Sequence, residues 1–398
     1  MRDAADAVLV LLALLLLVPS AFLFVQVVVG SFARQDPRPP FPPSRASVAV
    51  LMPAHDEEAG IAASIRSVLE QLRPGDRLLV VADNCSDRTA ALARSLGAEV
   101  VERSEPTLRG KGYALDFGVR ALEKMPADVV VVVDADCTLA PGALAALAGA
   151  CVATDRPVQA LYLMHPPSGA SLGIRLAAFA WIIRNKLRPL GASRLGWPCQ
   201  LMGTGMAFRW TAIEQAALAS GHLVEDMQLG LELALAGTPP LFCERALVES
   251  VFPSDSEGIA SQRMRWEHGH LATIGRDAPR MLWRAVRRLD LSLFTMVLDL
   301  AVPPLASLVL MLVIFAVMAV AWWAVMGAAV PLVLAGVALA LVASAVLLAW
   351  WREGRRLVSP RELAYLPVYV AAKIPVYVRI FTKRQAEWVR TKRDGQEP

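Results

Sequence analysis

The chain has 398 residues, 56% of them hydrophobic and 19% charged, and its mean hydropathy is +0.46. This composition is too apolar for an ordinary soluble enzyme. The net charge of +4 is modest and its arginines cluster beside apolar segments, which indicates membrane lipids as partners and no nucleic acid. The cysteines form no CxxC pair, and we expect free thiols at Cys85, Cys137, Cys151, Cys199 and Cys243.

The chain begins with an apolar segment, residues 8–29, that is long enough to cross roughly 30 Å of hydrocarbon as a helix. Arg2 and the small residues Ser20 and Ala21 would also suit a cleaved signal peptide, but the apolar run continues beyond them. We therefore expect a transmembrane anchor over residues 1–33 and a proline-rich linker over residues 34–46.

Residues 47–280 have the mixed polarity of a soluble domain. The pattern predicts strands at 47–52, at 78–82, near Glu99 and at 129–133, and helices at 61–72, at 87–96 and after Gly112. This alternation predicts an α/β fold with a mostly parallel sheet and helices on both faces.

Five consecutive valines at 129–133 predict a central strand that is buried on both faces. Asp134 and Asp136 follow at its carboxyl end, where open α/β sheets bind their ligands. Two carboxylates one residue apart can share a magnesium or manganese ion with the phosphates of a substrate. An acidic turn after a strand would produce the same pattern.

Polar clusters also follow the first two predicted strands, with PAHDEE at 53–58 and ADNCSD at 82–87. Acids at three successive strand ends are therefore expected to converge on one crevice. Asp87 is also explained as the N-cap of the next helix, whereas Asp83 has no such explanation.

Two further clusters complement this acidic crevice. In RGKG at 109–112, flanking glycines let Lys111 approach phosphate oxygens, although a solvated basic turn would have the same sequence. Glu225 and Asp226 lie in the first turn of a helix predicted over 223–237. The helix dipole explains acids at this place, and it also keeps a carboxylate ionised, as a general base requires.

The sequence QRMRWEHGH at 262–270 places Arg265 beside Trp266 on a predicted helix. Arginine suits a diphosphate leaving group and tryptophan suits the face of a sugar. An isolated pair of this kind is also typical of an anchor at a membrane interface.

After residue 280 the chain is predicted to return to the membrane. We expect an interfacial helix and membrane entry over 281–304, two transmembrane helices over 305–351, and an interfacial or re-entrant segment with a basic cytoplasmic tail over 352–398. Prolines and flanking basic residues argue against a fourth span at 363–381. The arginines beside the spans predict a multi-pass protein of the inner (plasma) membrane whose catalytic domain faces the cytoplasm.

Taken in order, the motifs resemble those of the family 2 glycosyltransferases, in the membrane-bound branch with cellulose, hyaluronan and chitin-oligosaccharide synthases and ceramide glucosyltransferases. The motifs are PAHDEE, ADNCSD, RGKG, DAD at 134–136, GTG at 203–205, ED at 225–226 and QxxRW at 262–266. Each is weak alone, whereas seven in sequence are a specific signal.

The resemblance implies a glycosyltransferase A (Rossmann-like) α/β domain in the cytoplasm, with transmembrane helices at both ends, a nucleotide-diphosphate sugar donor, and Mg²⁺ or Mn²⁺. Carried over position by position, it implies nucleoside contacts from His55, Glu57 and Asp83 and a phosphate contact from Lys111. It places Gly203 and Thr204 of the GTG motif in the substrate site and implies that Asp134 and Asp136 bind the metal and the donor. It further implies catalysis by Asp226 as base beside Glu225, and contacts to the diphosphate or the acceptor from Gln262, Arg265 and Trp266.

We therefore expect an inverting, metal-dependent glycosyltransferase that moves a sugar to a lipid-linked or glycan acceptor and forms a β-glycosidic bond. The expected donor is a UDP-sugar. A processive β-glycan synthase is the main alternative, and a homo-oligomer stays open. Val224 precedes the ED pair where processive synthases commonly have a small hydroxyl residue, which favours addition of one or a few sugars. A nucleotidyltransferase would not need QxxRW, and a channel would need ionisable residues within the spans.

Overall fold

The computed structural model of the chain describes residues 2–34, 46–220, 224–253, 256–371 and 374, without the side chains of residues 2 and 256–266. The chain divides into two compact units. One consists of residues 1–33, 168–196 and 263–385, and the other of residues 34–167, 197–262 and 386–398. We name them the helical unit and the α/β unit after their elements.

The α/β unit is built on one eight-stranded sheet. Its strands are β1 Val48–Ala54, β2 Arg77–Asp83, β3 Glu99–Arg103, β4 Val129–Val132, β5 Thr138–Leu139, β6 Val158–His165, β7 Met206–Arg209 and β8 Leu241–Val251. The strand order is β3-β2-β1-β4-β7-β6-β8-β5. The valine strand lies in the middle of the sheet and its residues are completely buried, which confirms the prediction made from their composition.

The sheet is mixed. Neighbours run parallel from β3 to β4, as predicted, and β6 runs parallel to β8. The prediction of a mostly parallel sheet is wrong for the other half, because β7 runs antiparallel to both β4 and β6, and β5 runs antiparallel to β8. Gly203 and Gly205 have φ angles of 86° and 65°, which glycine adopts without strain, and they turn the chain into β7.

The helices of the α/β unit are α2 Ile61–Leu69, α3 Thr89–Ser95, α4 Lys111–Leu122, α5 Ala143–Thr154, α8 Trp210–Ile213 and α9 Glu225–Leu235. α4 approaches the sheet closely at Gly118, where a Cβ atom would collide with the side chains of Leu51 and Val81. Leu51, Val81 and the fully buried Phe208 belong to one apolar cluster that joins α4 to the sheet. Burial of each such side chain stabilises the fold by about 1.5–3 kcal/mol, so the strand ends are held firmly.

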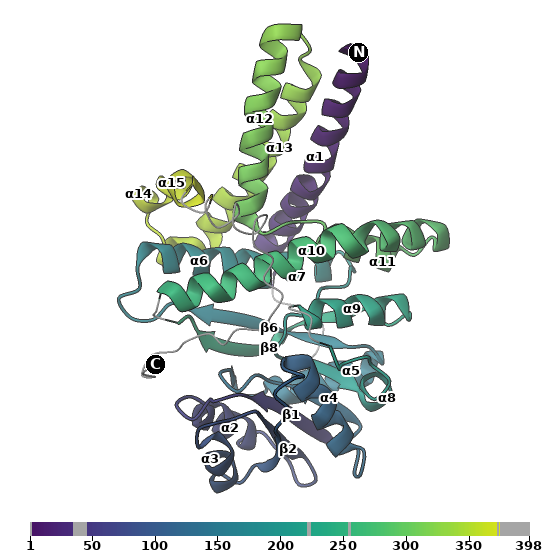
Figure 1. Cartoon of the computed structure of the whole chain (residues 1–398), viewed down its shortest axis with the longest axis vertical. Coiled ribbons are helices and arrows are strands. Elements are labelled where there is room, and N and C mark those ends of the chain that lie inside the picture. Colours follow the sequence, from purple (N-terminus) through teal and green to yellow (C-terminus); the bar gives the residue numbers. More distant parts are fainter. Residues whose placement is uncertain (1, 35–45, 221–223, 254–255, 372–373, 375–398) are drawn as a thin grey trace. The chain divides into compact units, whose positions relative to one another are not determined.

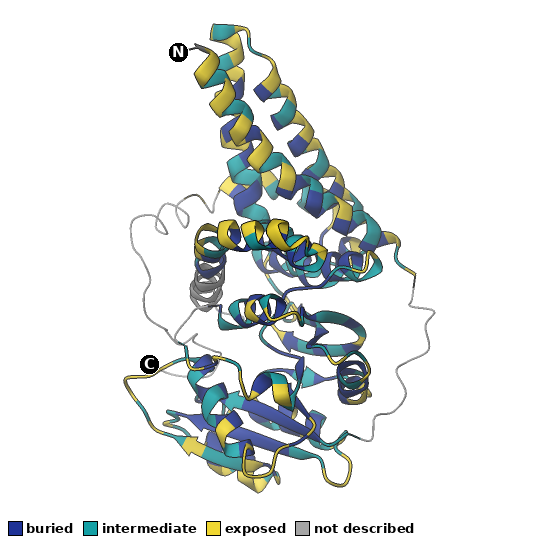
Figure 2. Cartoon of the chain, turned by 90° about the vertical axis from the view of Figure 1, so that its right-hand side faces the viewer, coloured by how far each residue is buried: buried dark blue, intermediate teal, exposed yellow. Residues whose placement is uncertain are grey.

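The elements of the helical unit are α1 Arg2–Phe32, α6 Leu172–Ile182, the π-helix η1 Ile183–Leu187, α7 Arg188–Arg194, α10 Ser256–Arg288 (from Arg263), α11 Leu291–Leu300, α12 Leu305–Met326, α13 Val330–Arg352, the 3-10 helix η2 Gly354–Arg356, α14 Pro360–Leu363 and α15 Leu366–Ala371. Three of them, α1, α12 and α13, are long and apolar enough to cross a membrane. They lie side by side (Figure 1). Large apolar side chains along them are exposed, as expected for lipid-facing helices (Figure 2).

Residues 168–196, which lie within the predicted domain 47–280, cluster with the helical unit, and the bounds of that domain stay a prediction. Close backbone packing explains the grouping, because a Cβ atom on Gly30 of α1 would collide with the carbonyl oxygen of Leu187. A buried polar cluster adds to the packing: Arg188 and Gln26 donate to the same Asp299 carboxylate oxygen at 2.8 and 2.7 Å. Breaking such a buried network is costly, so α1, α7 and α11 are held as one body.

The predicted interfacial helix and membrane entry, residues 281–304, contain the end of α10 and all of α11. Trp283, Leu289 and Leu291 are exposed there among arginines, and the interfacial location stays a prediction. In the segment 363–381, the structure has α15 at Leu366–Ala371, and residues 372–373 and 375–381 lie outside the described residues. The predicted re-entrant character of that segment stays a prediction.

Candidate active site

Lys111 is the centre of a cluster that joins three segments of the α/β unit. It is the first residue of α4, and its side chain forms an ion pair with Asp134, just beyond β4. The same ammonium group donates to the carbonyl oxygen of Gly203 at 2.7 Å. The backbone N–H of Asp134 in turn donates to Thr204 Oγ1 at 3.0 Å. The residues predicted from the RGKG, DAD and GTG motifs therefore lie in mutual contact.

The start of α9 brings two more carboxylates to this cluster. Glu225 and Asp226 are the first two residues of the helix, and both are half-buried. A Cβ atom on Gly203 would lie 3.3 Å from Asp226 Oδ2, which is a tight contact, and 3.6 Å from Lys111 Nζ, which is an ordinary one. Gly203 thus leaves room for a carboxylate and an ammonium group to face the same space.

The electrostatics follow from this concentration of acids around one lysine. Burial alone would lower the pKa of Lys111, but the charges of Asp134 and Glu225 raise it overall, so the lysine stays charged. Burial raises the pKa of Asp134, and the charge of Lys111 opposes that rise. Burial, followed by the charge of Asp226, raises the pKa of Glu225 to about 7. The cluster therefore carries excess negative charge that a cation would stabilise.

The donor groups beside Lys111 fit a hard divalent cation. One ligand atom from each of Asp134, Asp136 and Cys137 lies within 4.8 Å of the others. Carboxylate oxygens are the ligands that Mg²⁺ and Mn²⁺ prefer. The Cys137 thiol donates to Asp136 Oδ1 at 3.4 Å, and burial raises its pKa strongly, so it supports the carboxylate and stays protonated.

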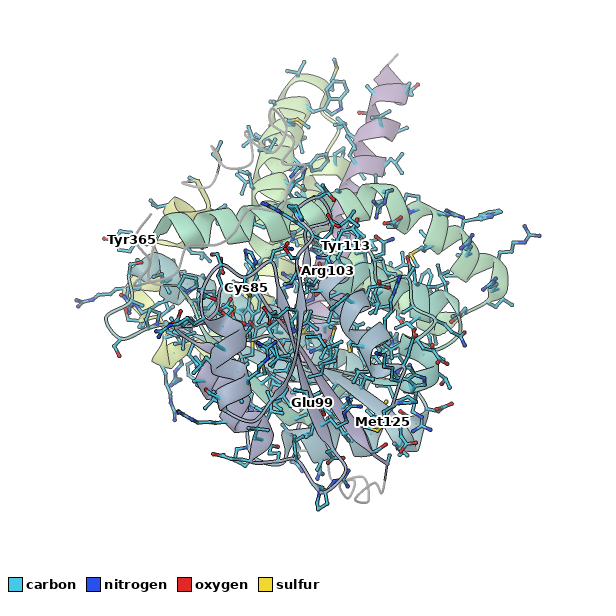
Figure 3. The ribbon with its side chains drawn as sticks, turned by 60° about the horizontal axis from the view of Figure 1, so that its bottom comes forward. Cys85, Glu99, Arg103, Tyr113, Met125 and Tyr365 are labelled. Atoms are coloured by element: carbon cyan, nitrogen blue, oxygen red, sulfur yellow. The ribbon has the colours of Figure 1, made fainter. Side chains whose placement is uncertain are left out.

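A second group of predicted residues lies at the ends of β1 and β2. His55 Nδ1 is 2.7 Å from the carbonyl oxygen of Asp83, which ties the two strand ends together. The backbone N–H of Glu57 donates to Thr89 Oγ1 at 2.7 Å. Asp83 is largely buried and forms a 2.6 Å ion pair with Arg103 at the end of β3. Figure 3 shows Arg103, Tyr113 and Cys85 at this end of the strands, away from Glu99 and Met125.

Three residues of these clusters were not predicted as site residues. Arg103 acts through Asp83, which is twenty positions away in the sequence, and Cys137 donates to its neighbour Asp136. Asp56 has a φ of 51° and accepts from the backbone N–H of Ser86 at 2.6 Å, which joins the loops after β1 and β2. An acid in a PAHDEE loop gives no sign of which loop it will bind. Asp87, predicted as an N-cap, lies one residue before the N-cap of α3 and accepts from the backbone N–H of Thr89 at 2.9 Å.

The residues of the QxxRW motif lie in the first part of α10. The side chains of Gln262, Arg265 and Trp266 fall outside the described residues. Their roles stay predictions.

Known proteins match the part of the chain that carries these motifs. A model of the family described as "Glycosyltransferase like family 2" matches residues 43–269. The chain is 27% identical over 243 residues to the probable glycosyltransferase YdaM of Bacillus subtilis, a match that covers 56% of this chain and 55% of YdaM. The chain thus spans about half the length of that relative. It is also 30% identical over 195 residues to an uncharacterized glycosyltransferase of Mycobacterium tuberculosis, covering 42% of this chain and 83% of the relative.

Among solved structures, the mannosyltransferase PcManGT from Pyrobaculum calidifontis, in complex with GDP-Man and Mn²⁺, has a similar fold. The match has a TM-score of 0.54 with 18% sequence identity, and it covers 95% of this chain and 100% of that one. This likeness shows a glycosyltransferase A-like fold.

Proposed function

Because the chain belongs to the family 2 glycosyltransferases, we propose that it transfers a sugar from a nucleotide-diphosphate sugar to a lipid-linked or glycan acceptor at a membrane. The donor is a UDP-sugar, and the transfer inverts the anomeric carbon to form a β-glycosidic bond. The observation that carries the proposal is the contact of Lys111 with both Asp134 and Gly203 beside the paired acids of α9. That arrangement offers a phosphate cation, metal-binding carboxylates and a proton acceptor together.

In the proposed reaction, Asp226 removes the proton from the acceptor hydroxyl as that oxygen attacks the anomeric carbon. The bond from the anomeric carbon to the diphosphate breaks in the same displacement, so an α-linked donor gives a β-linked product. Lys111 is placed to balance the charge of the departing diphosphate, and Arg265 is proposed to assist it. Glu225 stands beside Asp226, and its raised pKa lets it hold or release a proton near neutral pH.

Asp134 and Asp136 are the residues that would hold a divalent cation, Mg²⁺ or Mn²⁺, because their oxygens are close enough to share one. Such a cation supplies charge neutralisation for the two phosphates of the leaving group. Lys111 is paired directly with Asp134, and a divalent cation would neutralise the carboxylate charge that this one ammonium group does not balance.

The proposal of a membrane acceptor is supported by the three apolar helices α1, α12 and α13. Arginines follow the first predicted span, precede the second and follow the third, which favours a catalytic domain on the cytoplasmic side of the inner membrane. A nucleotide-sugar donor is soluble in the cytoplasm, whereas a lipid-linked acceptor stays in the bilayer. An enzyme that joins them is expected to have both parts.

The test is a panel of nucleotide-sugars given to the purified full-length protein with membrane lipid extract and Mg²⁺ or Mn²⁺. We expect release of a nucleoside diphosphate with one donor, loss of that release in Asp226→Asn, and retention in Glu232→Gln, an exposed acid on the same helix. Release of pyrophosphate would instead indicate a nucleotidyltransferase. No release with any donor, metal and acceptor would overturn the proposal.

A further inference from the structure

The two carboxylate oxygens of Asp83 differ in their hydrogen bonds. Oδ1 accepts from Arg103 Nη1 at 2.6 Å and from Asn84 Nδ2 at 2.9 Å. Within the described part of the chain, no donor binds Oδ2. A carboxylate oxygen has about two lone-pair sites, so Oδ1 is filled and Oδ2 is the one left to accept from a ligand.

Both groups that occupy Oδ1 are themselves fixed. Arg103 Nη2 donates to the carbonyl oxygen of Leu108 at 2.7 Å, and its guanidinium carbon lies 5.7 Å from the centre of the Tyr113 ring. Its side chain is only 9% exposed. Asn84, with a φ of 51°, accepts from the backbone N–H of Glu105 at 2.7 Å. Such a pair differs from a mobile surface ion pair, because other contacts determine the position of each donor.

The opposite charge also affects the ionisation of the acid. Burial raises the pKa of Asp83, whereas Arg103, and to a smaller degree His55, lowers it. Arg103 therefore favours the charged form of a carboxyl group that its surroundings would otherwise protonate.

We propose that Arg103 is a positioning residue that makes Asp83 a one-oxygen acceptor for the imide N–H of uracil, and so selects uridine donors over guanosine donors. This inference rests on the proposed function, in which Asp83 contacts the nucleoside. The pairing edge of uracil presents one N–H between two carbonyl oxygens. The single free oxygen of Asp83, Oδ2, matches this one N–H, because Arg103 and Asn84 already occupy Oδ1.

Guanine requires a different carboxylate. Its edge presents a ring N–H and an amino group side by side, which together need both oxygens of one carboxylate. Oδ1 of Asp83 is already filled, so one guanine donor would lose its hydrogen bond on binding. The fold alone does not decide the base, since the mannosyltransferase of similar fold was solved with GDP-Man.

The same two strands provide a matched control. Arg77 of β2 forms a 2.6 Å ion pair with Glu99 of β3, at the far end of the strands from Arg103 (Figure 3). Arg77→Met removes a cross-strand ion pair and one positive charge, as Arg103→Met does, without touching Asp83. Any general effect of strand pairing on nucleotide binding will appear in both variants.

The experiment measures binding of UDP, CDP and GDP with Mg²⁺ to the full-length protein by calorimetry. We expect the wild type to bind UDP at least about 10–100-fold more tightly than GDP, as the loss of one or two hydrogen bonds requires. Arg103→Met should reduce this preference to a few-fold, Arg103→Lys should recover part of it, and Arg77→Met should keep it.

Asp83→Asn gives a second readout that does not depend on the stability of the Arg103 variant. Its amide oxygen is expected to take the place of Oδ1 and its NH₂ group that of Oδ2, which then donates to the ring nitrogen of cytosine. We expect UDP binding to fall and CDP binding to rise about 10-fold or more.

Tighter binding of GDP than of UDP by the wild type would overturn the inference. So would an unchanged base preference in Arg103→Met, or an equal loss for all three nucleotides. In each of these cases the protein still binds nucleoside diphosphates, so the proposed glycosyl transfer stands; tighter binding of GDP would replace only the uridine part of the proposed donor. Failure of the wild type to bind any of the three would instead contradict the proposed function, and the inference with it.

Discussion

Glu225 provides a direct test of the electrostatics of the site. Its pKa is raised from 4.5 to about 7, first by burial and then by the charge of Asp226. Replacing it with glutamine keeps the size and hydrogen-bonding capacity of the side chain but removes the charge at every pH. The variant should therefore differ from the wild type in stability only where Glu225 would be ionised.

The sign follows from the order of the two pKa values. The folded state binds the proton of Glu225 more tightly than the unfolded state does, so this stabilising contribution is fully present below about pH 4.5 and is lost as the pH rises through about 7. A pKa change of this size corresponds to a loss of about 3 kcal/mol of unfolding free energy. Solvent reaches the half-buried side chain, so we expect about 1–3 kcal/mol.

The assay compares the Tm of wild type and Glu225→Gln at pH 5 and pH 8, in detergent with EDTA and without nucleotide, so that no bound cation masks the effect. We expect the Tm of the variant at pH 8 to lie several degrees above that of the wild type, because 1 kcal/mol shifts the Tm of a unit of this size by about 2–4 °C. Glu232→Gln, which replaces an exposed acid on the same helix, should show no such gain. A gain that is equal at both pH values would refute the argument.

Three other outcomes follow from the proposed function. Asp136→Ala should lose metal-dependent binding of nucleoside diphosphate in calorimetry, whereas Asp226→Asn should bind it nearly normally and lose about 10²–10⁴-fold in kcat; equal losses of binding would contradict this division of roles. Cysteines placed at Asp3 and Gly327 in a cysteine-free chain should react with an impermeant reagent in intact cells, and one at Gly395 should not; labelling of Gly395 would require a fourth span. Labelled sugar should partition into organic solvent with a lipid product, and label in a long, solvent-insoluble chain would favour a processive synthase instead.

Local patterns in the sequence determined the elements on which the site is built. The valine run predicts a doubly buried strand because no two-faced surface strand would have that composition, and β4 lies in the middle of the sheet. The long apolar segments at about 305–325 and 328–351 similarly predict two helices, and the structure has helices at Leu305–Met326 and Val330–Arg352. Such properties depend on neighbours in the chain, so they can be read without the fold.

The direction of β7 and the grouping of residues 168–196 were decided by tertiary structure. Helical residues of ordinary composition give no sign that Leu187 will pack its backbone against Gly30, which is far away in the sequence. The direction of β7 depends on two glycine turns whose effect is defined only by the strand that they approach.

The candidate site shows the same division between chemistry and geometry. The sequence supplied the chemical types of Lys111, Asp134 and Asp226, because ammonium and carboxylate groups after strands suit phosphate and metal whatever their partners are. It did not indicate that Arg103 would fill one oxygen of Asp83 and leave the other open. Twenty positions separate these two residues in the chain, and only the pairing of β2 with β3 brings a charge from one strand end onto the other. A hydrogen bond requires atoms within about 3 Å, and in a folded chain such distances between remote residues are set by tertiary packing.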